Sequence, residues 1–147
     1  MRSVTRTRSF QAPPEEIWRL VSDPYSLPRW WPSVVRVEDA SDDAWTKVMR
    51  APRGGIVRAD YTRTESRPRT RLVWRQELEE SPFERIFSSS VTEIELQPEG
   101  EGRTRVELTA VQRLRGRFRL GGFMVRRASK RLLDDALDGI ERSVAPA

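Results

Sequence analysis

The sequence predicts an α+β fold in which a seven-stranded antiparallel sheet wraps around one long C-terminal helix. Two changes of pattern indicate this fold. Residues 34–114 form short β-type runs separated by turn residues, and the residues after 122 return to a period of 3.6. The connections between the runs are short, which favours an antiparallel meander over parallel crossovers. The apolar face of such a sheet needs a cover, and only the C-terminal helix is large enough to provide it.

One strand and two short helices are predicted before the meander. Residues 2–10 alternate as an extended chain does, although neither face is plainly apolar. Residues 13–16, two prolines followed by two glutamates, are typical of a helix start, because proline fits the first turn and carboxylates there complement the helix dipole. Asp23 before Pro24 resembles an N-cap, so a second short helix is expected from about Pro24 to Trp31.

The rest of the chain supplies six strands and the terminal helix. The strands are predicted at about 33–40, 44–51, 56–66, 70–79, 84–97 and 103–114. The helix carries one long apolar stripe, made of Val125, Ala128, Leu132, Leu133, Ala136, Leu137, Ile140 and Val144. The element order is therefore β-α-α-β-β-β-β-β-β-α. No repeat, low-complexity tract or composition break divides the chain, so residues 1–147 are interpreted as a single domain.

The composition excludes several classes of site. The 147-residue chain contains neither Cys nor His, which leaves no thiolate nucleophile, imidazole base, disulfide, or zinc or haem site built from nitrogen and sulfur ligands. No cofactor and no metal are therefore expected. No apolar stretch reaches the roughly 20 residues of a membrane span, and the N-terminus lacks the apolar region of a secretory signal, so a cytoplasmic protein is predicted.

Four short motifs occur in an order that resembles a known family. They are residues 12–18 (Ala-Pro-Pro-Glu-Glu-Ile-Trp), 22–24 (Ser-Asp-Pro), 28–32 (Pro-Arg-Trp-Trp-Pro) and 68–74 (Pro-Arg-Thr-Arg-Leu-Val-Trp). With the element order, they resemble the START-like helix-grip superfamily (SRPBCC), in particular its polyketide cyclase/dehydrase and lipid-transport branch. The resemblance covers essentially the whole chain. It implies a helix-grip fold whose cavity, between the curved sheet and the last helix, holds a hydrophobic or aromatic small molecule.

Strand parity and the five tryptophans predict which residues line this cavity. Indole combines a large apolar area with one N–H donor, which suits a wall for aromatic ligands, and ordinary core packing is the alternative. On the strands, polar side chains share the inward face with apolar ones, which favours a wet pocket over a closed core of mutual hydrogen bonds. The predicted ligand-binding residues are Trp31, Tyr61, Trp74, Gln76, Ser88, Ser90, Gln112 and Met124.

No catalytic residue is assigned from the sequence. The carboxylates of Glu77, Glu93 and Glu95 are predicted to point outward by the same parity, as solvated side chains. Two functions stay open: a polyketide cyclase/dehydrase-like enzyme, and a non-catalytic carrier or sensor of a lipid or other small molecule. The enzyme predicts an ionisable group that faces the cavity with a displaced pKa. The carrier predicts that all polar groups in the cavity are neutral.

An arginine-rich segment, residues 111–131, contains eight positive charges and no negative one. Four of its arginines recur at every second position, so an extended chain is predicted to display them on one side, and two more begin the terminal helix. The predicted anion-binding residues are Arg113, Arg115, Arg117, Arg119, Arg126 and Arg127. They suit an acidic partner or an anionic membrane surface; a solvated face with pairs such as Arg131 with Asp135 is the alternative. Nucleic-acid binding is disfavoured, because the chain lacks both a recognition-helix motif and alternating aromatic and basic surface residues.

Overall fold

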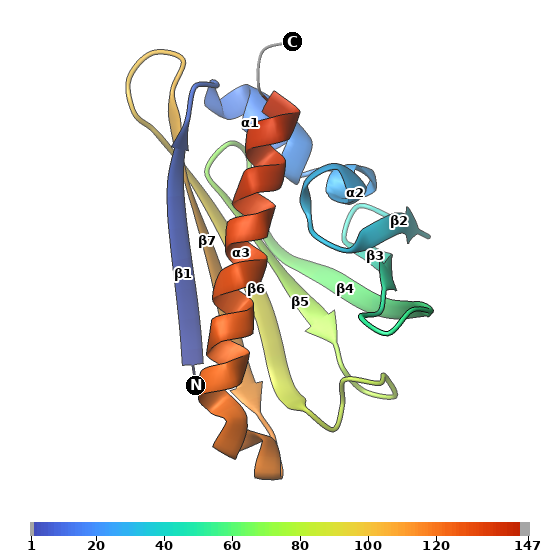
Figure 1. Cartoon of the computed structure of the whole chain (residues 1–147). Helices are drawn as coiled ribbons and strands as arrows, with labels where there is room; N and C mark the ends of the chain where they lie inside the picture. The colour runs from blue at the N-terminus through green and yellow to red at the C-terminus, as the bar shows by residue number, and fades with distance from the viewer. Residues whose placement is uncertain (1, 145–147) are drawn as a thin grey trace.

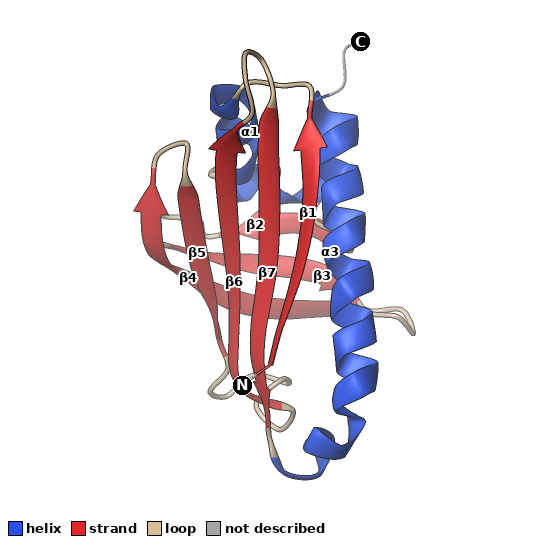
Figure 2. Ribbon diagram, turned by 90° about the vertical axis from the view of Figure 1, so that its left-hand side faces the viewer, coloured by secondary structure: helices blue, strands red, loops and turns tan. Residues whose placement is uncertain are grey.

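The computed structural model describes residues 2–144, in which a seven-stranded antiparallel sheet curves around the long helix α3 (Gly122–Val144) (Figure 1). The sheet order is β1-β7-β6-β5-β4-β3-β2, and Figure 2 shows β2 and β3 running across behind the other strands, so the sheet is strongly curved. The predicted α+β helix-grip fold is confirmed. The strands are β1 (Arg2–Phe10), β2 (Val34–Glu38), β3 (Ala44–Arg50), β4 (Ile56–Arg67), β5 (Arg71–Glu77), β6 (Phe87–Pro98) and β7 (Thr104–Leu114).

Two short helical segments follow β1 and cover one end of the sheet. Helix α1 (Pro14–Val21) begins at a proline and carries two glutamates in its first turn, as the sequence predicts. The predicted second helix is present as a 3₁₀ turn (Pro24–Ser26) that continues into α2 (Leu27–Trp30). Asp23 caps it, because its Oδ1 accepts a hydrogen bond of 3.0 Å from the backbone N–H of Tyr25. None of the helices in residues 2–144 is long and apolar enough to cross a membrane.

Ion pairs between β1 and α3 explain why the inner face of β1 carries arginines between the buried Val4 and Phe10. Arg6 and Arg8 lie on the side of β1 that faces the helix, where Arg6 donates to both carboxylate oxygens of Asp134, at 2.8 and 3.0 Å. Arg8 donates to Asp138 at 2.7 Å. The hydrogen bonds from Arg6 lower the pKa of the Asp134 carboxyl. The acidic later turns of α3, which oppose the helix dipole, therefore hold the edge strand against the helix.

A glycine of α3, Gly139, allows this helix to pack closely against α2. A Cβ atom added to Gly139 would lie 2.1 Å from the carbonyl oxygen of Trp30 and 2.6 Å from its Cα. Only a residue without a side chain permits this approach of the two backbones. The contact fixes α2, and with it Trp30 and the adjacent Trp31, above the inner face of the sheet.

The predicted apolar stripe of α3 is buried only in its C-terminal part. Leu133, Ala136, Leu137 and Ile140 are buried, whereas Ala128 is exposed and Leu132 is half-buried. The first turns of α3 instead border a groove on the outside of the molecule, which is described below. The stripe therefore packs into the core in the C-terminal part of the helix and lines this groove in the N-terminal part.

The predicted extended geometry of Arg113 to Arg119 is wrong. Strand β7 ends at Leu114, and residues 116–121 form a 3₁₀ helix (Gly116–Gly121) that leads into α3. Gly116 adopts a positive φ of 49°, which turns the chain at this point. The every-second-residue spacing of these arginines therefore does not place them on one side.

Candidate functional site

An inner cavity of about 230 Å³ lies between the sheet, the segment after α2, and α3. Its polar lining comes from strands β3 to β7 and from Ser33 before β2, and its apolar lining includes residues of the loop before β6 and of α3. The polar side chains are Ser33, Lys47, Tyr61, Gln76, Ser90, Thr92 and Gln112. The larger apolar side chains are Trp31, Met49, Phe83, Phe87, Leu132 and Leu133.

The rings of Trp31 and Tyr61 line one wall of this cavity, and Trp45 and Trp74 pack against them outside the lining. Trp31 packs edge-on against Trp74, with ring centres 5.6 Å apart, and Trp74 packs edge-on against Trp45 at 5.7 Å. Tyr61 stacks on Trp45 with an angle of 10° between the rings. Edge-to-face and stacked contacts of this kind fix the orientation of each ring. The wall is therefore a connected set of rings.

Lys47 is enclosed by this aromatic wall. Its side chain is 1% exposed, and its Nζ lies 4.4 Å from the centre of the Trp31 ring, 4.2 Å from that of Tyr61 and 5.2 Å from that of Trp74. Within residues 2–144, no carboxylate forms an ion pair with this lysine. Burial lowers the pKa of Lys47 to about 7 and raises the pKa of Tyr61. Near neutral pH, the cavity therefore contains an amine that is partly uncharged.

The alternation of β3 directs Lys47 inward. Trp45, Lys47 and Met49 occupy successive inward positions, and Lys47 is paired across the sheet with Ala59 of β4. The small methyl group of Ala59 leaves room for the long side chain. Sequence reasoning missed this residue. The available signal was that Trp45, Lys47 and Met49 occupy every second position of the strand, so that the lysine shares the face of its two apolar neighbours.

Two glutamines of the inner face differ in their hydrogen bonding. The Oε1 of Gln112 accepts a bond of 3.1 Å from the hydroxyl of Ser129 on α3, as a closed core would arrange. Gln76 is buried, but its Nε2 has no hydrogen-bond partner in the described chain. Gln76 is the cross-strand partner of Tyr61. The cavity therefore offers an unused amide donor next to the phenol ring that contacts Lys47.

The structure brings together five of the eight predicted ligand-binding residues. Those that line the inner cavity are Trp31, Tyr61, Gln76, Ser90 and Gln112. Trp74 is almost fully buried behind Trp31 and Lys47 and is not among the lining residues. Ser88 and Met124 lie elsewhere.

The inward position predicted for Ser88 is wrong. Strand β6 has an irregularity between Phe87 and Ser89, so the alternation that holds from Ser90 onward does not extend to Ser88. Its side chain is exposed, and its hydroxyl donates to the backbone carbonyl of Arg113 at 3.4 Å.

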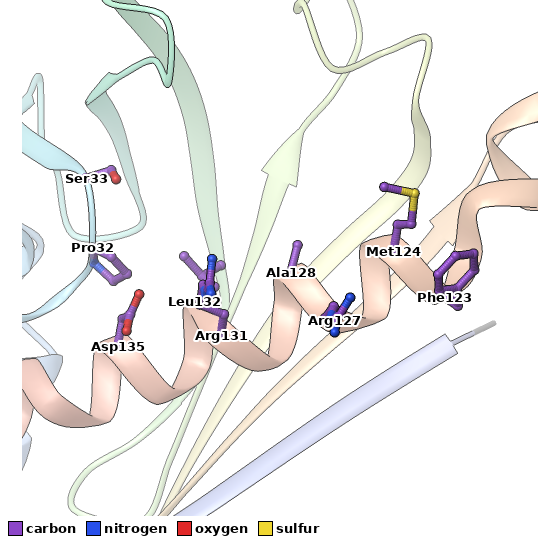
Figure 3. A pocket seen from close by; sticks show the side chains of 9 residues that line it. All are labelled: Pro32, Ser33, Phe123, Met124, Arg127, Ala128, Arg131, Leu132 and Asp135. Atoms are coloured by element: carbon purple, nitrogen blue, oxygen red, sulfur yellow. The ribbon is translucent and has the colours of Figure 1, made fainter.

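Met124 lines an outer groove of about 540 Å³ (Figure 3). Met124, Ala128 and Leu132 follow one another along one side of α3, facing Pro32 and Ser33 across the groove. The outer groove and the inner cavity share three lining residues, which are Pro32, Ser33 and Leu132. Leu132 therefore stands between the two spaces.

The predicted anion-binding arginines divide into two groups. Arg115 and Arg119 donate to the backbone carbonyls of Phe87 and Leu114, at 3.2 and 3.4 Å, so they hold the connection before α3 together. All six are exposed, and the structure shows no side-chain hydrogen bond or ion pair for the other four, Arg113, Arg117, Arg126 and Arg127, within residues 2–144. Arg127 also borders the outer groove. The ion pairs within the described chain do not include Arg131 with Asp135. No cluster of three or more acidic side chains in residues 2–144 is arranged to hold a metal ion.

A curved antiparallel sheet that grips a long helix over an interior cavity defines the START-like helix-grip class. The sequence matches, over residues 1–145, the family described as polyketide cyclase/dehydrase and lipid transport, and the chain belongs to this family. The family relationship predicted from the four motifs is confirmed. No curated protein matches the sequence.

Solved structures share this fold at low sequence identity. The aromatase/cyclase Zhui from Streptomyces sp. R1128 is 19% identical with a TM-score of 0.79, over 97% of this chain and 92% of that chain. A START superfamily protein from Mycobacterium smegmatis is 15% identical with a TM-score of 0.79, over 97% and 96%. The di-domain ARO/CYC BexL from the BE-7585A biosynthetic pathway is 22% identical with a TM-score of 0.81, over 98% of this chain and 46% of that chain. The chain thus spans about half the length of the di-domain protein.

Proposed function

We propose that this protein binds a small aromatic or otherwise apolar molecule in the inner cavity. The observation that carries this proposal is an aromatic wall that encloses the Lys47 amine, next to a buried amide donor without a partner, Gln76 Nε2. An unpaired buried donor costs about 1–3 kcal/mol, and a bound oxygen acceptor removes that cost. The ligand therefore combines a flat apolar body with at least one acceptor oxygen.

The volume of the cavity limits the size of the ligand. About 230 Å³ is slightly below the roughly 300 Å³ at which typical ligand pockets begin, so the inner cavity suits a compact molecule of one or two rings. A longer molecule extends past Leu132 into the outer groove, whose apolar lining is continuous with it.

A cyclase/dehydrase-like activity is favoured over passive transport by one observation. A carrier cavity is expected to contain neutral polar groups, whereas Lys47 is ionisable and has a pKa displaced to about 7. The START superfamily and aromatase/cyclase neighbours support the fold for both activities.

Calorimetric titration with 1-naphthol, a two-ring molecule with one oxygen, tests the binding proposal. Ala110 lines the inner cavity, so Ala110→Leu fills it and is expected to weaken binding by about tenfold or more. Ala128→Leu is the matched control in the outer groove and is expected to leave binding within about twofold. Melting temperatures check that both variants fold. Loss of binding in Ala128→Leu alone, or no binding to the native protein, would overturn the proposed site.

A second proposal concerns the surface around the start of α3. Leu120, Phe123 and Met124 are exposed there, beside Arg126 and Arg127. Exposed apolar side chains among arginines suit an anionic lipid surface, where the apolar groups enter the headgroup region and the guanidinium groups pair with phosphates.

A further inference from the structure

Lys47 is the only primary amine among the residues that line the inner cavity. The chain contains two lysines, Lys47 and Lys130, against 25 arginines. Lys130 is exposed on α3, whereas Lys47 is buried. An arginine at position 47 could not give up its proton in a protein, but a lysine can. The one buried cationic side chain of the cavity is thus of the type that can become a neutral nucleophile.

The surroundings of Lys47 favour its neutral form. The titratable groups among the lining residues are Lys47 itself, on β3, and Tyr61, on β4. Residues of β5, β6, β7 and α3 that face the cavity contribute glutamines, hydroxyls and apolar groups, with no carboxylate. Desolvation is the cause of the lowered pKa, about 7, and no nearby charge offsets it. At neutral pH, a large fraction of the Lys47 side chains therefore carries a free electron pair.

We propose that Lys47 is a catalytic nucleophile that forms an imine with a ketone or aldehyde group of the molecule bound in the inner cavity. This inference rests on the proposed function, because it assumes that an aromatic or apolar ligand enters that cavity. The ligand class is accordingly an aromatic or apolar carbonyl compound. Nucleophilic lysines in apolar pockets are activated in this way toward carbonyl substrates.

The step is balanced without any further reactant. The electron pair of Nζ attacks the carbonyl carbon, and the two protons of the amine move to the carbonyl oxygen, which leaves as water. The product is a C=N bond between the ligand and Lys47. The cationic form of this imine withdraws electrons from the neighbouring carbon, so a C–H bond there becomes more acidic. Gln76 supports the attack, because its unpartnered Nε2 can donate to the carbonyl oxygen as negative charge develops on it.

The aromatic wall positions such a ligand. The rings of Trp31 and Tyr61 lie within 4.4 Å of Nζ, measured to the ring centres, so a flat ligand packed against either ring lies next to the amine. Holding the two reacting groups together raises the effective concentration of the amine.

Incubation of the native protein with 1-phenylbutane-1,3-dione tests the proposal. An amine condenses with this 1,3-diketone, loses one water and forms a conjugated enaminone, which is stable without reduction and absorbs in the near ultraviolet. Mass spectrometry is expected to show one adduct per chain, with the mass of the diketone minus one water. Peptide mapping at pH 7 is expected to place it on Lys47, with labelling of Lys130 lower by about tenfold or more.

Two variants and one competitor complete the experiment. Lys47→Met is expected to abolish the adduct, while Lys130→Met is expected to retain it. 1-Naphthol, which has no carbonyl group, is expected to slow adduct formation by occupying the same cavity. The absence of an adduct in the native protein, or equal labelling of both lysines, would overturn the nucleophile. If 1-naphthol still binds in that case, the proposed ligand binding stands and only the imine is refuted.

Discussion

Burial of Lys47 makes the stability of the protein depend on pH in a defined direction. The unfolded chain binds the proton of this lysine up to about its ordinary pKa of 10.5, while the folded protein releases it near 7. Between these values the unfolded state holds more protons, so the free energy of unfolding increases as the pH rises. The difference between 10.5 and about 7 corresponds to about 5 kcal/mol over the full range.

Part of this range can be measured without interference from tyrosine. Tyr61 has a raised pKa in the folded protein, so above about pH 10 the unfolded state gains stability by ionising it. Between pH 7 and pH 9.5, the linkage relation gives an increase in the free energy of unfolding of about 3 kcal/mol.

Urea unfolding at constant ionic strength, followed by tryptophan fluorescence at several pH values, measures this increase. Lys47→Met replaces the amine by an apolar group of similar length, so we expect it to be more stable at pH 7 and to lose the increase. Lys130→Met, at an exposed position of α3, is expected to keep it. Parallel pH curves for the native protein and Lys47→Met would refute the release of a proton from Lys47 on folding.

Two further predictions concern the helices. Gly139→Ala would stabilise an ordinary helix by about 1 kcal/mol, but here the added methyl group meets the α2 backbone at 2.1 Å, so a loss of about 3 kcal/mol or more is expected in urea unfolding. Gly121→Ala, with open space around it, is expected to stay within about 0.5 kcal/mol of the native protein. Reversal of Arg126 and Arg127 to Glu is expected to abolish sedimentation with anionic vesicles at low salt, whereas Arg19→Glu, on α1 at the far end of α3 (Figure 1), is expected to retain it. Equal binding of both charge variants would contradict the basic surface.

The fold could be predicted because its signals are local. Turn residues bound each strand, the period changes from two to 3.6 after Gly122, and every predicted strand is present with bounds that differ by at most three residues. The errors arise where one residue breaks the alternation or turns the chain, as at the irregularity before Ser89 and at Gly116. A single shifted residue moves a side chain to the other face, and no propensity indicates it beforehand.

The candidate site could be predicted only in part, because its central residue violates the rule on which sequence reasoning relies. Charged side chains are rarely buried without a partner, so a lysine within a strand is assigned to the solvent face. The sheet overrides this preference at Lys47, since Trp45 and Met49 on either side fix the register of β3. Arg6 shows the same limit: its partner Asp134 lies 128 residues away, and only the fold brings them together.

The pKa of Lys47 in the folded protein determines both the pH dependence of stability and the reactivity of the amine. The proposed chemistry can therefore be tested in two independent ways. The pH at which the increase in unfolding free energy begins reports the pKa of Lys47 in the folded protein. The pH dependence of enaminone formation reports the same group, because only the neutral amine attacks the diketone. If Lys47 is the nucleophile, the increase in unfolding free energy begins near pH 7, and enaminone formation reaches half of its maximal rate near the same pH. An adduct whose formation begins only near pH 10, in a protein whose stability rises from pH 7, would mean that a different amine reacts and that burial of Lys47 serves the core alone.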